Sequence, residues 1–253
     1  MQQGLERWAN RLGMKRALVH GRDRLVRLLE GDHGSPVERR NQRDDHHLRL
    51  LLRFGLRADS NCLEVGANQG MFLHDMCQVA PDGHHIAYEP IEHLAAKLVQ
   101  RFPAVEVRQR ALSDHDGQAE FVWVIDPGFQ GLSGLADHVN PSLRPDGVQT
   151  EVITVTMERL DDHLPPGWLP SLVKIDVEGA EQLVLQGALS TLRQAQPIVV
   201  FEHGLTDGVS QEIYELLCKD VGLRLFNMDG HGPLSLSQFL EQLSTRWNWV
   251  AHR

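Results

Sequence analysis

The sequence lacks the apolar segments that would place a protein in a membrane or lead it out of the cell. None of its apolar runs approaches the roughly 20 residues that a membrane-spanning helix needs. Its first residues contain no apolar core of a secretory signal, and its three cysteines have neither disulfide nor metal-ligand spacing. We therefore expect a cytoplasmic protein with reduced thiols and no membrane span.

Positive charge is scarce outside the N-terminal quarter. Residues 1–60 carry 13 Lys and Arg against 8 Asp and Glu, whereas the remainder carries 12 against 26, for a net charge of −9. An acidic main domain is poorly suited to holding nucleic acid by its phosphates, so we expect no nucleic-acid partner. The length allows one large domain with a small extension. We predict an N-terminal helical cap over residues 1–58, which either covers a site or packs against a second subunit of a homo-oligomer. The main domain would then occupy 59–253.

The glycine pattern of a dinucleotide-binding turn is also missing, although its surroundings are present. Residues 61–70 read N-C-L-E-V-G-A-N-Q-G, in which Cys62–Val65 predicts a buried strand and Met71–Ala80 a helix. A strand, a glycine turn and a helix N-terminus are the parts of a nucleotide-type site, and Gly66 and Gly70 would let backbone approach a ligand. Asn68, however, stands where G-x-G-x-x-G has its middle glycine.

The acid beside this turn suggests a different ligand. The Glu64 carboxylate would repel a pyrophosphate and attract an ammonium group. S-Adenosylmethionine (SAM) carries an ammonium and a sulfonium but no phosphate. Glu89 follows the predicted strand His85–Tyr88, where an acid accepts both ribose hydroxyls. In the stretch 111–114, which reads as a turn, Ser113 would suit the edge of adenine.

Polar side chains also follow two later strands. Leu172–Ile175 ends at Asp176, and Ile198–Phe201 ends at Glu202 and His203. Open α/β sheets place ligands at such strand ends. These three side chains could hold a divalent ion such as Mg²⁺ and thereby orient a substrate oxygen. Alternatively, His203 is a metal-free general base.

The rest of the chain predicts further alternating elements. Residues 177–186 read as a helix that opens directly after Asp176, and Met157–His163 reads as another. The long stretch 125–145 is rich in Gly and Pro, and we interpret its segment 131–134 as part of a substrate-side lid. Further strands are expected at 105–108, 119–124 and 150–156, with an antiparallel pair at 223–227 and 247–251.

Together these motifs resemble the FkbM-type SAM-dependent methyltransferases over roughly residues 45–253. The matching segments, in family order, are L-E-V-G-A-N-Q-G, Y-E-P, A-L-S-D, T-M-E-R-L-D-D, V-K-I-D-V-E-G-A-E and F-E-H-G. The resemblance implies an α/β fold with a seven-stranded Rossmann-like sheet, mostly parallel, whose last strand is antiparallel. It also implies transfer of a methyl group from SAM to a hydroxyl of a small molecule, such as a sugar or a secondary metabolite.

The resemblance assigns roles to the candidate residues. The methionine part of SAM would be held by Glu64, Gly66, Asn68 and Gly70, with Glu89 on ribose and Ser113 near adenine. Asp176, Glu202 and His203 would deprotonate the acceptor or hold a metal, and His203 stands where the family often has a carboxylate or an amide. Two alternatives stay open at this point, a nicotinamide-linked dehydrogenase and a non-catalytic SAM-fold binding protein.

Overall fold

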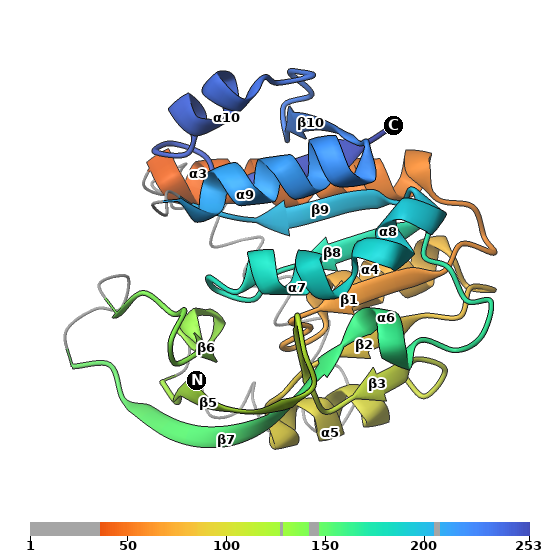
Figure 1. Ribbon diagram of the computed structural model, residues 1–253. Coiled ribbons are helices and arrows are strands. Elements are labelled where there is room, and N and C mark those ends of the chain that lie inside the picture. The colour runs from red at the N-terminus through yellow and green to blue at the C-terminus, as the bar shows by residue number, and fades with distance from the viewer. Residues whose placement is uncertain (1–35, 127–128, 142–146, 205–207) are drawn as a thin grey trace, which may run out of the picture. The chain divides into compact units, whose positions relative to one another are not determined.

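The computed structural model describes residues 36–126, 129–141, 147–204 and 208–253 (Figure 1). The chain divides into two compact units, residues 1–45 and 46–253. Helix α3 (Pro36–Gly55) begins in the first unit and ends in the second. The helices expected within residues 1–30 lie outside the described residues, and the predicted boundary at residue 58 stays a prediction. No helix of the described residues is long and apolar enough to cross a membrane.

The second unit is built on a seven-stranded sheet with the strand order β10-β11-β9-β8-β1-β2-β3. Strand β11 runs antiparallel to both of its neighbours, and the other described pairings of this sheet are parallel. This arrangement confirms the predicted fold class. The strands are β1 (Cys62–Val65), β2 (Ile86–Tyr88), β3 (Glu106–Arg108), β8 (Leu172–Ile175), β9 (Ile198–Glu202), β10 (Arg224–Asn227) and β11 (Asn248–His252).

Helices cover both faces of this sheet, which explains why its central strands are short apolar runs. Leu63 and Val65 of β1 pack against the helices α7 (Glu181–Gly187), α8 (Leu189–Ala195) and α9 (Val209–Glu215), which lie on the near face in Figure 1. Cys62 faces the other side, where it packs against α4 (Met71–Val79) and the end of α3. The remaining helices that the structure describes in the second unit are α5 (Glu92–Arg101), the 3-10 helix η1 (Gln130–Leu132), α6 (Leu160–His163), the π-helix η3 (Leu216–Val221) and α10 (Leu236–Gln242).

A second, four-stranded sheet was not predicted as such. Its order is β4-β7-β5-β6, with β4 (Ala111–Ser113), β5 (Gly117–Val124), β6 (Gly134–Leu135) and β7 (Thr150–Arg159). The turn predicted at 111–114 is therefore largely a strand. The helix predicted over 157–163 is wrong in its first half, because β7 continues to Arg159 and leaves only Leu160–His163 helical. Pairing with two neighbouring strands keeps residues 157–159 extended, because Met157 lies opposite Ala111 of β4 and Gly117 of β5.

The segment after β8 also differs from the prediction. Helix α7 begins at Glu181 rather than at Val177. Glu178 and Gly179 have φ angles of 53° and 102°, and a left-handed backbone cannot continue a right-handed helix. Residues 177–180 therefore form a turn at the carboxyl edge of the sheet, where they lie beside the candidate site.

Candidate functional site

The glycine turn after β1 is fixed against the ends of both neighbouring strands. Gly66 has a φ of 80°, and a Cβ on it would lie 1.9 Å from the carbonyl oxygen of Asp176. The N–H groups of Gly66 and Ala67 both donate to the carbonyl oxygen of Tyr88, at 3.0 Å each. Glycine is therefore required at position 66 for steric and conformational reasons together. The result is a rigid turn that brings the ends of β1, β2 and β8 into contact.

Gly70 serves a different purpose from the one predicted. A Cβ on Gly70 would lie 2.6 Å from side-chain atoms of both Leu98 and Phe102. This glycine therefore allows the first turn of α4 to pack closely on α5. It does not line either of the two cavities described below.

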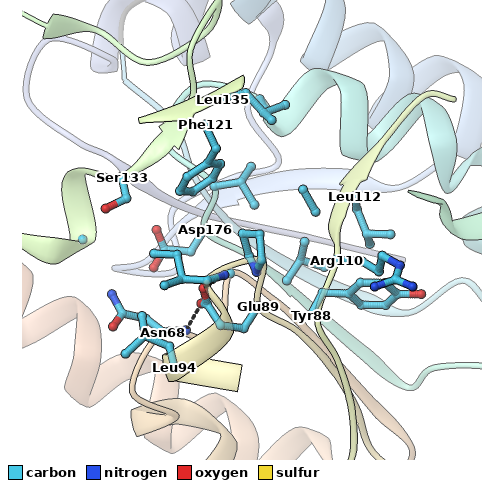
Figure 2. Close-up of a pocket in the computed structure, with 18 of the residues that line it drawn as sticks. Asn68, Tyr88, Glu89, Leu94, Arg110, Leu112, Phe121, Ser133, Leu135 and Asp176 are labelled. Carbon is cyan, nitrogen blue, oxygen red and sulfur yellow. Dashed lines mark hydrogen bonds between the residues drawn. The ribbon is translucent and has the colours of Figure 1, made fainter. Parts of the chain in front are cut away.

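The first cavity lies between the strand ends and the second sheet (Figure 2). In the view of Figure 2, Phe121, Ser133 and Leu135 of the second sheet and its loop lie above it, and Asn68 and Glu89 lie below. Asp176 lies between these two groups. An apolar cavity with a few convergent polar groups is the usual form of a small-molecule site. The remaining lining residues are Val65, Gly66, Tyr88, Pro90, Ile91, Leu94, Arg110, Ala111, Leu112, Gln130, Gly131, Val177 and Ala180.

Glu89 is the buried acid of this cavity, with 3% of its surface exposed. Its carboxylate accepts hydrogen bonds from the backbone N–H groups of Asn68, at 2.7 Å, and Ile91, at 2.9 Å. Burial raises the pKa of Glu89 to about 7, and the two backbone donors partly oppose this rise. Each carboxylate oxygen can accept a further hydrogen bond, so the group can still receive two hydroxyls.

A second cavity adjoins the first on the α4 side of the turn. It shares Gly66, Asn68 and Asp176 with the first cavity, so both cavities border the glycine turn. Its other lining residues are Glu64, Ala67, Gln69, Met71, Phe72 and Lys174.

Glu64 is the buried acid of the second cavity. Only 2% of its surface is exposed, and its Oε2 atom has no hydrogen-bond partner in the structure. Burial raises the pKa of Glu64 to about 8, although Lys174 lowers it in part. An acceptor atom that is buried without a partner costs about 1–3 kcal/mol, which a bound donor group would recover. Glu64 is therefore poised to accept a hydrogen bond from a ligand.

Lys174 supplies the only positive charge among the residues that line the second cavity. Its Nζ atom donates to Oδ2 of Asp176 at 2.9 Å and lies 4.9 Å from the centre of the Phe72 ring. Burial disfavours the charged amine, but the carboxylates of Asp176 and Glu64 outweigh this effect and raise the pKa of Lys174. The ammonium is therefore retained in the interior of the protein.

The structure does not bring the three candidate catalytic residues together. Asp176 lines both cavities, and Glu202 ends β9 close enough to affect the charge state of Lys174. His203 is 3% exposed and lines neither cavity. Its Nε2 lies 2.8 Å from Oγ of Ser210, and its Nδ1 lies 3.4 Å from Oε2 of Glu181.

These contacts do not fit a divalent ion shared by Asp176, Glu202 and His203. Both ring nitrogens of His203 already have hydrogen-bond partners, and the carboxylate of Asp176 is paired with an ammonium group. In the described ranges, the ligand atoms of the three residues do not converge within 4.8 Å of one another. We therefore derive no catalytic step through a metal ion.

Ser113 also lies apart from the cavities. It is buried in β4, where its hydroxyl donates to Asp114 at 3.1 Å and its carbonyl oxygen faces Gly187. Its neighbours Ala111 and Leu112 line the first cavity instead. The role predicted for Ser113 beside adenine stays a prediction, and in the structure this side chain is buried within β4 and does not line the first cavity.

Comparison with known proteins gives a consistent result. Residues 64–225, more than half of the chain, match the family described as the Methyltransferase FkbM domain. A stretch of 193 residues is 29% identical to the AMB antimetabolite synthetase AmbE of Pseudomonas aeruginosa, covering 61% of this chain and 9% of that protein. The crystal structure of methyltransferase FkbM from Methylobacillus flagellatus superposes with a TM-score of 0.50 at 14% identity. That superposition covers 78% of this chain and 44% of that one, so the chain spans less than half of either protein.

Proposed function

We propose that the chain, which belongs to the FkbM methyltransferase domain family, is a SAM-dependent methyltransferase that methylates a hydroxyl group of a small molecule. The observation that carries this proposal is the pair of buried acids, Glu64 and Glu89, beside two cavities that border one glycine turn. Family membership sets aside the alternative of a nicotinamide-linked dehydrogenase.

The two cavities differ in the way that the two ends of SAM differ. The first is largely apolar and contains Glu89, which suits adenine with its ribose hydroxyls. The second contains Glu64 and Lys174, which suit an amino acid end. A donor lying across Gly66 would place its sulfonium near Asp176, which lines both cavities. Of the cofactor residues predicted from sequence, Glu64, Gly66, Asn68 and Glu89 support this placement.

The proposed reaction is an in-line displacement. The acceptor oxygen forms a bond to the methyl carbon while the carbon–sulfur bond breaks, and the bonding electrons stay on sulfur to give S-adenosylhomocysteine (SAH). The proton of the acceptor hydroxyl passes to a carboxylate or to solvent. Because the sulfonium is already activated, holding the reacting atoms in line supplies much of the rate enhancement.

We assign the proton-accepting or orienting role to Asp176, with Glu202 beside it. Asp176 is partly exposed and lies where the two cavities meet, so an acceptor oxygen can reach it. We assign His203 an indirect role, since its ring contacts Glu181 rather than a cavity. Glu181 in turn accepts a hydrogen bond from the N–H of Gly179 at 2.8 Å, which ties His203 to the turn after Asp176.

Two observations support a small-molecule acceptor. The main domain is acidic, which disfavours nucleic acid. The partly matching relative is named as an antimetabolite synthetase, which favours a secondary metabolite over a sugar.

Calorimetric titration with SAH and with NADH tests the donor site. We expect one SAH bound per chain and no binding of NADH, and Glu92→Gln, an exposed acid of α5, serves as a charge-matched control for Glu89→Gln. Transfer of a labelled methyl group to a panel of hydroxyl, amine and thiol compounds then tests the acceptor class. A protein that does not bind SAH, or that labels only amines, would contradict the proposal.

A further inference from the structure

Lys174 is an unusual residue for its place in the fold. It lies within β8, a central strand whose four residues are all buried, and it retains its charge there. A buried lysine normally lowers stability unless its charge has partners. The strand register places Lys174 directly beside Glu64 of β1. The two side chains therefore project from the same face of the sheet.

The surroundings of this pair point to a ligand. Both residues line the second cavity, and Oε2 of the almost fully buried Glu64 has no hydrogen-bond partner in the structure. An ammonium group has three N–H donors, and Lys174 uses one of them on Asp176. A cavity with an unused acceptor next to a cation with unused donors fits a zwitterion, which carries an ammonium and a carboxylate a few atoms apart.

We propose that Lys174 binds the α-carboxylate of the methyl donor and makes the protein selective for donors with an intact amino acid end. This inference rests on the proposed function. Glu64 accepts the donor's ammonium, and Lys174 binds its carboxylate, so each charge of the zwitterion has an opposite partner. The same lysine stays paired with Asp176, which links recognition of the amino acid end to the carboxylate nearest the proposed reaction centre.

The alternative is that Lys174 only balances the charge of its acidic neighbours. The pKa of Lys174 is raised by Asp176, Glu64 and Glu202. Without the lysine, these carboxyl groups would repel one another more strongly when ionised. If Lys174 were only such a counter-ion, its removal would change the binding affinities of all adenosine ligands equally. If Lys174 binds a carboxylate, its removal would weaken the binding of only those ligands that carry one.

Three ligands separate these roles without any mutation. SAH carries both charges, its decarboxylated analogue keeps the amine only, and 5′-methylthioadenosine lacks the amino acid end altogether. Charge-assisted hydrogen bonds contribute enough that loss of the carboxylate should weaken binding to the wild-type protein about 10- to 100-fold. Equal affinities for SAH and its decarboxylated analogue would overturn the proposal even if both bind well.

Lys174→Met extends the test. We expect this variant to bind 5′-methylthioadenosine as the wild type does, which also shows that it is folded, while SAH weakens to the affinity of the decarboxylated analogue. The affinity of SAM relative to SAH should rise, because removing a cation favours the sulfonium. Lys219→Met, in which the lost lysine is exposed and paired with Glu215, is the matched control and should change none of these values.

The outcomes distinguish this inference from the proposed function. If the wild type binds neither SAH nor 5′-methylthioadenosine, both fail. If both ligands bind and Lys174→Met weakens them equally, Lys174 is a counter-ion only and the selectivity proposal is wrong, whereas the proposed function stands. If Lys174→Met does not fold, the three-ligand comparison on the wild type decides.

Discussion

The carboxylate of Glu89 accepts a hydrogen bond from the backbone N–H of Asn68 at 2.7 Å, which joins the end of β2 to the glycine turn after β1. Asn68 itself has a left-handed backbone with a φ of 47°, a conformation that asparagine tolerates better than most residues. The acid thus has two functions in one position. It holds the turn in shape and presents its remaining acceptor sites to the first cavity.

Replacing Glu89 by Gln should separate these functions. The amide can still accept from Asn68, so we expect the fold to persist, but a neutral group binds ribose hydroxyls less strongly. We predict that SAH affinity falls about 10- to 100-fold, in line with the loss of charge-assisted hydrogen bonds. Calorimetry measures this change, and Glu92→Gln is the control. Undiminished affinity in Glu89→Gln would remove the acid from the ribose site.

The raised pKa values of Glu64 and Glu89 predict a dependence on pH. Burial raises both above the ordinary value of 4.5, to about 8 and about 7, so the folded, ligand-free protein holds more protons than the unfolded chain. The free energy of unfolding should therefore fall as pH rises from about 5 to about 8. Thermal unfolding of the free protein across this range measures the trend. A rising stability over the same range would contradict it.

Ligand binding should show the opposite trend. An ammonium group binds the ionised form of Glu64, so SAH affinity should increase with pH up to about 8, with release of protons on binding. Calorimetry in buffers of different ionisation enthalpy counts these protons. The Glu64→Gln variant should release fewer, and equal release by both proteins would place the titrating group elsewhere.

His203 should act on turnover without contacting the donor. His203→Ala removes a ring that contacts both Glu181 and Ser210, so we expect loss of about 1–3 kcal/mol of stability and much reduced methyl transfer. SAH affinity should stay near that of the wild type. Ser210→Ala should lower turnover less than His203→Ala does, and its pH–rate profile should match that of the wild type. Unchanged turnover in His203→Ala would remove the residue from the mechanism.

Methyl transfer should not depend on a divalent ion. Lys174 already pairs with Asp176, and both ring nitrogens of His203 have protein partners. We therefore expect the rate to be the same with and without a chelator. The check is a rate measurement after prolonged treatment with EDTA and gel filtration. A rate that is lost on this treatment and restored by Mg²⁺ would contradict the expectation.

Gly66→Ala should be among the most disruptive single substitutions in the described chain. The new Cβ would lie 1.9 Å from the carbonyl oxygen of Asp176, and both the contact and the positive φ are unfavourable. We expect a loss of more than about 3 kcal/mol or failure to fold, as measured by chemical denaturation. Gly131→Ala has open space around the new atom and should unfold like the wild type.

The central sheet could be predicted because its strands obey local rules. Cys62–Val65 and Leu172–Ile175 are apolar runs bounded by polar or turn residues, and the structure has strands with these same limits. The resemblance to a family then indicated a seven-stranded sheet with a reversed last strand, which periodicity alone does not supply. Glu64 and Glu89 were noticed for the same reason, since acids within or just after apolar strands stand out in sequence, and their roles in binding the donor stay predictions.

The rest depended on contacts between distant segments. In the second sheet, Gly117–Val124 pairs with Thr150–Arg159. Because of this pairing, β7 includes residues 157–159, although their local sequence pattern resembles that of a helix. The orientation of His203 depends on Ser210 and Glu181, neither of which its neighbours in sequence indicate. Adjacent residues at a strand end can project in different directions, so a shared ion could not be inferred from their proximity in the chain alone.

The close contact between Gly66 and the carbonyl of Asp176 has a consequence for engineering. The loop that would carry the donor and the strand end that would face the acceptor pack so closely that position 66 has no room for a side chain. Exchange of segments between relatives should therefore succeed only when residues around 66 and 176 are transplanted together. In a chimaera that takes only one of these segments from a relative, the two segments would pack poorly against each other, whatever substrate the chimaera was designed to accept.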